Sequence, residues 1–194
     1  MRKLKKSIIY FEKSGSDNTD ETIKLAYERA LELNIRDIVV ASTHGSTALK
    51  VAKTFSDQRF NVVAVTICEG YKSEGWAMSR EERAKLQAKG VKVLTGIHAL
   101  GDDVSSAFTE KFGGKSFNEV VAQTLYRFCQ GMKVCVEIVL MAADAGLIPV
   151  DEEVIAIAGT GEGADTAIVV KPAYPRKFLD LKVNEVIAKP REGI

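Results

Sequence analysis

The residues best suited to binding chemistry form one short run, Ser-Thr-His-Gly-Ser-Thr, at positions 42–47. The run follows an apolar, strand-like segment and precedes a segment with helical periodicity. A helix that begins near Gly45 would present unpaired amides and the positive end of its dipole to an anion. The hydroxyls of Ser42, Ser46 and Thr47 would add donors. The same residue types also favour an ordinary N-capped turn. The pattern therefore predicts either an anion site or a polar turn.

Two further residues of this run, Thr43 and His44, extend its polar surface. The imidazole of His44 could bond to a phosphate or transfer a proton, or it could have a structural or capping role. The run itself lacks the Gly-Lys-Ser/Thr sequence of a P-loop, so it does not predict a site for nucleotide triphosphates.

A second polar loop follows a predicted strand at 154–158 and contains Gly159, Thr160, Gly161, Glu162, Gly163 and Asp165. A dinucleotide fingerprint must open a helix in the first strand-helix unit, whereas this loop runs into a strand-like segment at 166–169. We therefore reject a dinucleotide site. The glycines favour either a tight backbone wall beside a ligand or a plain turn.

The remaining candidates lie in loops. Tyr71 and Trp76, in a long loop at 68–78, could cover an aromatic ligand or merely anchor the loop. His98 is close in sequence to Asp102 and Asp103, but no nucleophile lies at a spacing typical of a catalytic site, so no catalytic residue is assigned. The three cysteines lack zinc-like spacing with the two histidines, so we expect reduced thiols and no metal site.

The elements that must position these residues alternate between strands and helices. Strand-like segments lie at 7–11, 37–41, 61–66, 91–94, 154–158 and 166–171, and the tail at 178–188 can add another. This alternation predicts a three-layer α/β/α sandwich with a mostly parallel sheet. Ligands in such folds lie at the carboxyl ends of the strands. The loops at 14–18, 42–47, 69–76, 95–103 and 160–165 are therefore expected on one rim.

Helix signals are strong in places. Asn18 with Glu21, Ser79 with Glu82, and Ser116 with Glu119 have the spacing of capping boxes. The region 116–145 is helical, with a break expected near residues 130–131. Its apolar stripe comprises Val121, Leu125, Phe128, Met132, Cys135 and Val139. The stripe predicts core packing or a homo-oligomer interface.

Composition narrows the class of protein. The chain has 194 residues, 46% hydrophobic and 27% charged, which is ordinary for one globular domain spanning 1–194. A net charge of +1 gives no reason to expect nucleic-acid binding. No apolar run approaches the roughly 20 residues of a membrane span. We expect a cytoplasmic protein without membrane or nucleic-acid partners.

Two segments resemble the C-terminal α/β domain of pyruvate kinase. Residues 39–48, with 61–66 downstream, are similar to its hydroxyl-rich loop region, and residues 159–170 resemble its second signature. The resemblance covers a core of about 7–170, leaving the tail 171–194, and implies a mixed sheet with an antiparallel edge strand. In that family the hydroxyl-rich loop binds a phosphate of a sugar-bisphosphate effector, which implicates Ser42, Gly45 and Thr47 directly.

Two departures from the family pattern bear on the ligand. His44 replaces a usual Ser or Thr, and Ala164 with Asp165 replaces a Thr-Asn-like pair. The charge of Asp165 favours a monophosphate bearing hydroxyls over a bisphosphate. No catalytic barrel fits beside this domain within 194 residues, so we do not expect pyruvate kinase activity. The chain resembles stand-alone archaeal-type proteins related to the domain, with which FMN is associated.

The resemblance thus implies that the chain binds a phosphorylated small molecule, FMN, with alternatives of a small flavin-dependent oxidoreductase or a sugar-phosphate-sensing module. FMN would place its phosphate at 42–47, its ribityl hydroxyls near Asp165 or Glu162, and its ring near the aromatic loop. The cofactor-binding residues expected on the rim are Ser14, Gly15, Asn18, Ser42, Thr43, His44, Gly45, Ser46, Thr47, Thr66, Glu69, Gly70, Trp76, Gly159, Thr160, Gly161, Glu162, Gly163 and Asp165.

Overall fold

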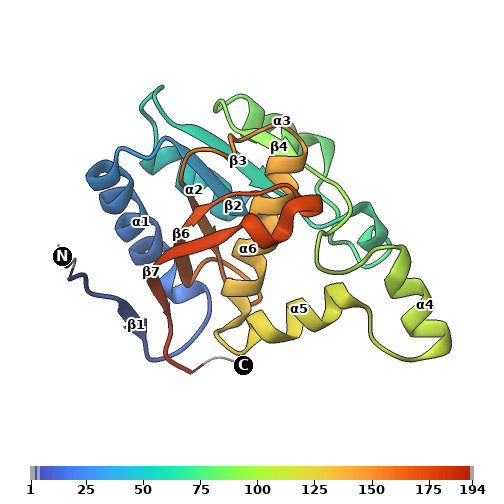
Figure 1. The fold of residues 1–194 in the computed structure, drawn as a ribbon. Coiled ribbons are helices and arrows are strands. Elements are labelled where there is room, and N and C mark those ends of the chain that lie inside the picture. Colours follow the sequence, from blue (N-terminus) through green and yellow to red (C-terminus); the bar gives the residue numbers. More distant parts are fainter. Residues whose placement is uncertain (1–2, 4, 193–194) are drawn as a thin grey trace.

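A seven-stranded sheet forms the middle layer of the computed structural model, which describes residue 3 and residues 5–192 (Figure 1). The outermost residues of the predicted domain, 1, 2, 4, 193 and 194, lie outside the described part. The strand order is β1-β7-β6-β5-β2-β3-β4. The strands are β1 (Ile9–Phe11), β2 (Asp37–Ala41), β3 (Asn61–Val65), β4 (Lys92–Leu94), β5 (Val154–Ala158), β6 (Thr166–Lys171) and β7 (Lys182–Pro190).

The sheet is mostly parallel, as predicted. Strands β5, β2, β3 and β4 pair in parallel, and so do β1 and β7. Among the described strands, β6 alone runs antiparallel to both of its neighbours. The prediction that the antiparallel strand lies at the edge is wrong, because β7, built from the C-terminal tail, and β1 continue the sheet beyond β6.

Helices cover both faces of the sheet. The helices are α1 (Thr19–Leu33), α2 (Ser46–Thr54), α3 (Arg80–Gln87), α4 (Val104–Phe112), α5 (Phe117–Tyr126) and α6 (Gln130–Asp144), with short 3-10 turns at Ser16–Asn18, Glu69–Tyr71 and Pro175–Asp180. Helices α1, α2 and α3 pack on one face and α6 on the other, which gives the predicted three layers. In Figure 1, α5 leads from α6 to α4, which projects from the body of the molecule.

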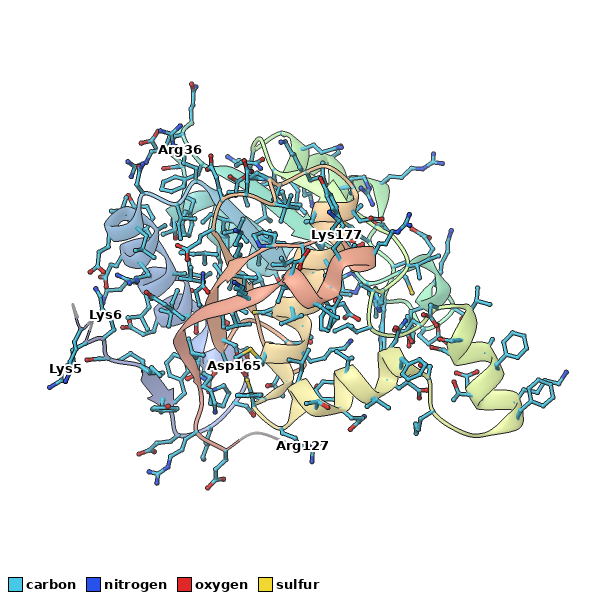
Figure 2. The ribbon with its side chains drawn as sticks, viewed as in Figure 1. Lys5, Lys6, Arg36, Arg127, Asp165 and Lys177 are labelled. Atoms are coloured by element: carbon cyan, nitrogen blue, oxygen red, sulfur yellow. The ribbon has the colours of Figure 1, made fainter. Side chains whose placement is uncertain are left out.

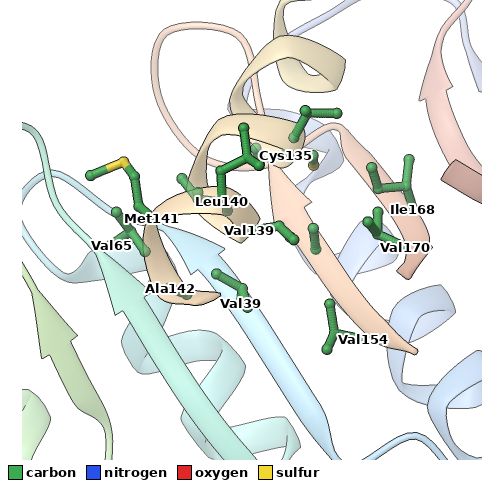
Figure 3. Close-up of a cluster of buried hydrophobic side chains, with 14 of the residues drawn as sticks. Val39, Val65, Cys135, Val139, Leu140, Met141, Ala142, Val154, Ile168 and Val170 are labelled. Carbon is green, nitrogen blue, oxygen red and sulfur yellow. The ribbon is translucent and has the colours of Figure 1, made fainter. Parts of the chain in front are cut away.

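Alternation along the strands divides the core into two clusters. Val39 of β2 faces α6, whereas its neighbours Ile38 and Val40 face α1 and α2, because successive strand residues point to opposite faces. Figure 3 shows the α6 cluster, in which Cys135 and Val139 pack over the sheet. The core interpretation of the apolar stripe is therefore confirmed for the α6 residues, while Phe128 stays half exposed.

Local helix signals were correct in most places. The capping boxes at Ser79 and Ser116 are present, and the helical region breaks between Tyr126 and Gln130. The capping box at Asn18 is not formed, because a 3-10 turn precedes α1 and the Asn18 amide donates to Lys13 and Gly15 carbonyls instead. Helix α4 was not predicted. None of the helices in the described part is both long and apolar enough to cross a membrane.

Candidate functional site

A pocket of about 560 Å³ opens at the carboxyl edge of the parallel strands. Strands β1 to β5 all point toward this edge, so the loops that follow them share one rim, as the sequence predicts. The pocket lies between α2, on one face of the sheet, and α6, on the other. Its lining includes the loop between β2 and α2, the ends of β3 and β5, and one side of α6.

The N-terminus of α2 forms one end of the pocket. Gly45, the N-cap residue, has φ of 89°, a left-handed conformation that favours glycine. Glycine has no side chain that could cap the helix. Instead, the hydroxyl oxygen of Ser42 accepts a hydrogen bond from the Ala48 amide, at 3.2 Å. The amides of Ser46 and Thr47 have no hydrogen-bond acceptor among the described residues. One amide is therefore capped, as in an ordinary polar turn, and two others remain as donors that an anion site would need.

Charged side chains surround this helix end. His44 Nδ1 lies 3.3 Å from Glu82 Oε1, which ties the loop to the start of α3. The pKa of Glu82 is lowered, first by the hydrogen bond from the Ser79 backbone and also by His44. Lys50, one turn into α2, lines the pocket and bonds to Asp20 at 2.8 Å. The positive helix end and Lys50 favour an anion here, while the carboxylates of Asp20 and Glu82 offset part of that positive charge.

The loop between β5 and β6 forms a tight backbone wall. A Cβ atom on Gly163, whose φ is 73°, would lie 2.3 Å from the Thr19 hydroxyl, and one on Gly159 would lie 2.8 Å from the Gly163 carbonyl oxygen. The hydroxyl of Thr19 also accepts the Ala164 amide at 3.0 Å. Gly159, Gly161, Glu162 and Gly163 all line the pocket. The predicted close-packed wall is therefore present.

Asp165 supports this wall from inside rather than facing the pocket. Its side chain is fully buried, and in Figure 2 it lies within the molecule while Arg36 and Arg127 extend from the surface. One carboxylate oxygen accepts the amides of Gly15, at 2.9 Å, and Thr160, at 3.2 Å, and the other accepts the Thr166 hydroxyl at 2.8 Å. Because these bonds occupy both oxygens, Asp165 joins two rim loops and is not exposed to bind ribityl hydroxyls.

The structure brings together only part of the predicted set. Predicted residues that line the pocket are Ser42, Thr43, His44, Ser46, Thr47, Thr66, Gly159, Gly161, Glu162 and Gly163. Predicted residues outside the lining are Ser14, Gly15, Asn18, Gly45, Glu69, Gly70, Trp76, Thr160 and Asp165. Trp76 is half exposed and stacks on Tyr71, with ring centroids 5.5 Å apart. Its contact favours the anchoring role over contact with a ligand in this pocket.

A hydrogen-bonded chain connects the long loop to the pocket rim. The Tyr71 hydroxyl donates to Asp102 at 2.6 Å, and Asp102 lies 2.7 Å from His98 Nδ1. His98 Nε2 accepts the Cys68 amide at 3.2 Å, so Nδ1 carries the proton in this arrangement. Hydrogen bonding to Asp102 raises the pKa of Tyr71 to about 12. Both ring nitrogens of His98 are thus engaged, which suits positioning of the rim rather than proton transfer.

Helix α6 contributes residues that were not predicted. Gln130, Lys133 and Glu137 line the pocket beside apolar side chains of the same helix. Lys133 Nζ lies 2.6 Å from Glu137 Oε2, and both side chains are almost fully buried. A signal was present in the sequence, because Lys133 and Glu137 are charged residues four apart within an otherwise apolar helical segment.

Comparison with known proteins places the chain in a family. Residues 20–170 match the model of the family described as pyruvate kinase, alpha/beta domain. Of the pocket-lining residues, only Ser16 and Thr19 fall outside the matched range. Among solved structures, the crystal structure of Cryptosporidium parvum pyruvate kinase is similar, with 15% sequence identity and a TM-score of 0.39. The alignment covers 79% of the present chain and 22% of that chain.

Proposed function

Because the chain belongs to the family of pyruvate kinase alpha/beta domains, we propose that it binds a phosphorylated small molecule and that this ligand is FMN. The resemblance to stand-alone archaeal-type relatives associated with FMN supports this choice of ligand. The observation that carries the proposal is the N-terminus of α2, where two amides without an acceptor among the described residues and the Thr47 side chain meet a pocket at the carboxyl edge of the sheet.

The phosphate end of FMN fits the groups at this helix end. Amides at a helix N-terminus bind phosphate through hydrogen bonds and the helix dipole. Thr43, Ser46 and Thr47 add hydroxyls, and Lys50 adds a positive charge to the same part of the lining. Thr47 is buried, with 5% of its surface exposed, so a bond from its hydroxyl would be protected from water.

The remainder of the pocket suits a flat ring of moderate size. Its volume of about 560 Å³ falls within the range of about 300–1,000 Å³ that is typical of small-molecule sites. The apolar wall comes from Val65, Ile67, Val134, Ile138 and Met141, so this wall replaces the aromatic loop as the support for the ring. Glu162, on the opposite loop, offers a carboxylate to ribityl hydroxyls. Bound FMN would supply redox chemistry, which the protein residues would hold in place and orient.

Titration with FMN and riboflavin tests the proposal. Riboflavin lacks the phosphate for which the α2 amides and hydroxyls are arranged, and charge-assisted hydrogen bonds are the strong ones. FMN should therefore bind at least about tenfold more tightly, a difference of about 1.4 kcal/mol. Equal affinities would refute the phosphate site. Binding of a sugar phosphate but neither flavin would favour the sugar-phosphate-sensing alternative.

Reduction of bound FMN by an electron donor separates a binding protein from the flavin-dependent oxidoreductase alternative. Turnover of the reduced flavin with an added acceptor, above the rate of free FMN, would favour the enzyme. A rate equal to that of free FMN would favour a carrier or sensor.

A further inference from the structure

The α6 wall of the pocket contains an ion pair whose location is unusual for a purely structural feature. Lys133 and Glu137 have side chains only 10% and 5% exposed, and Nζ lies 2.6 Å from Oε2. They are one turn apart on a helix whose neighbouring residues Val134, Val136 and Ile138 are apolar. Both charged residues line the pocket.

Stability of the fold does not account for this pair. Removing two charges from water costs several kcal/mol per ion, and apolar residues of similar volume are often equally stable in such positions. Small-molecule pockets are mostly apolar and fix the orientation of their ligand through a small number of polar or charged groups, and these two side chains are such groups in the α6 wall. The pocket is where a ligand would meet these two groups.

The hydrogen bonds orient the pair, with Lys133 as the available donor. Glu137 uses one oxygen for the Leu100 amide, at 3.0 Å, and the other for Lys133. An ammonium group has three N–H donors, and Glu137 is the acceptor found for Lys133 among the described residues. The Tyr126 ring lies on one side, 5.9 Å from Nζ. Lys133 thus retains donor capacity at the pocket wall while Glu137 has both oxygens bonded.

The residues around Lys133 indicate which part of a ligand would reach its ammonium group. Val134, Ile138 and Met141 line the same wall, so a flat apolar body would lie against α6. The phosphate site is on α2, which packs on the opposite face of the sheet. A ligand that spans the pocket would therefore bring its non-phosphate end toward Lys133.

We propose that Lys133, held in place by Glu137, forms a second polar subsite that binds a carbonyl or carboxylate oxygen at the end of the ligand remote from its phosphate. This inference rests on the proposed function and narrows the ligand to phosphate monoesters that carry such an oxygen. The ring carbonyl groups of FMN are oxygens of this class.

Calorimetric titration of the Lys133→Met/Glu137→Gln variant tests the subsite. The double change removes both charges together, and the introduced glutamine side chain keeps an acceptor for the Leu100 amide, so no unpaired charge is left buried. Two probes are used: FMN, which carries ring carbonyls, and phenyl phosphate, which carries none. FMN affinity should fall at least about tenfold relative to wild type, whereas phenyl phosphate affinity should stay within about twofold of wild type.

Two further variants of the pair separate the loss of charge from poor folding of the Lys133→Met/Glu137→Gln protein. Lys133→Arg keeps a charged donor and should retain most of the FMN affinity. Lys133→Gln/Glu137→Gln keeps a neutral hydrogen-bonded pair and should lose FMN affinity in the same direction, which covers poor folding of the Met variant. Lys115→Met/Glu119→Gln is the matched control, because Lys115 and Glu119 form a pair with the same spacing, 3.1 Å apart and absent from the pocket lining, in which Lys115 is exposed and Glu119 is partly buried. The introduced glutamine keeps an acceptor for the Ser116 amide, which Glu119 caps.

The outcomes separate the subsite from the phosphate site. Unchanged FMN affinity in the charge-free variants would overturn the subsite and leave the proposed function standing. An equal loss for FMN and phenyl phosphate would also overturn it, since that result indicates a general change in the pocket. Failure of the wild-type protein to bind either compound would overturn the proposed function together with the subsite.

Discussion

Asp165 is a single buried carboxylate on which two segments of the binding rim depend. Its hydrogen bonds join the amide of Gly15, after β1, to the amide of Thr160, after β5, although these residues are far apart in sequence. The sequence suggested that this charge would lie near the ligand. The structure instead makes it the internal support of the loops that surround the ligand.

Asp165→Asn should lower the free energy of unfolding by about 1–3 kcal/mol, because a buried, charge-assisted set of bonds is weakened. The variant should also bind ligand more weakly, since Gly15 and Thr160 are no longer held together. Urea denaturation measures the first effect and ligand titration the second. Asp144→Asn, at the exposed end of α6, is the control and should match wild type. An Asp165→Asn protein as stable as wild type would show that the carboxylate is dispensable.

The hydrogen bond between Tyr71 and Asp102 can be tested through the pH dependence of stability. Its bond to Asp102 raises its pKa to about 12 from an ordinary value of 10.0, which favours the neutral phenol in the folded state. The stability from this bond is therefore fully present below about pH 10 and is lost as the pH rises toward 12. Tyr71→Phe should be less stable than wild type at neutral pH, with a difference that narrows between about pH 10 and 12. Urea denaturation at a series of pH values measures this difference, and a constant difference across that range would contradict the assignment.

Helix α6 is the element that links the core to the pocket. One side packs on the sheet through Cys135 and Val139, and another lines the pocket through Lys133 and Ile138. Movement of this helix would therefore change stability and ligand binding together.

Leu140→Ala should destabilise the protein by about 2–5 kcal/mol, because it removes a side chain that is 1% exposed and leaves a cavity between α6 and its surroundings. The midpoint of denaturation measures the loss. Leu179→Ala is the matched control, because Leu179 is 93% exposed and the same change should have little effect. Similar losses in both variants would indicate that α6 packing does not determine stability.

Sequence periodicity predicted the elements and the shared rim well, for a physical reason. Parallel strands end at the same edge, so loops such as 42–47 and 159–163 had to lie together once the strand pattern was recognised. Two features of the pocket region could not be predicted from sequence periodicity. The approach of Lys133 to the pocket depends on how α6 packs across the sheet, and the stacking of Trp76 on Tyr71 depends on a loop without periodicity.

The prediction that the antiparallel strand β6 lies at the edge of the sheet was wrong. The tail strand β7 has a weak apolar signal because its first residues are exposed, and its outer partner β1 is far away in the sequence. Only the completed sheet reveals that β7 and β1 lie outside β6.

For the whole molecule, the main feature is a pocket between two helical layers at one edge of a mixed sheet. The chain belongs to the pyruvate kinase alpha/beta domain family, and its pocket lies almost entirely within the matched residues. The homo-oligomer proposed through 116–145 stays a prediction for sedimentation equilibrium to test. Because most of α6 is buried within the subunit, such a contact would use α5, where Phe117 and Val120 are exposed.

The central claim is that the N-terminus of α2 binds the phosphate of the ligand, and the Thr47→Val variant tests it most directly. Valine keeps the size of Thr47 but removes a hydroxyl donor to a charged group, and the loss should be about 1.5–3 kcal/mol of FMN binding energy. Thr54→Val is the matched control on the same helix, since Thr54 lies at its far end and its hydroxyl donates to the Lys50 carbonyl of the same helix.

Calorimetric titration with FMN should therefore give at least about tenfold weaker binding for Thr47→Val and wild-type affinity for Thr54→Val, with both variants folded. Wild-type FMN affinity in a folded Thr47→Val protein would contradict the account.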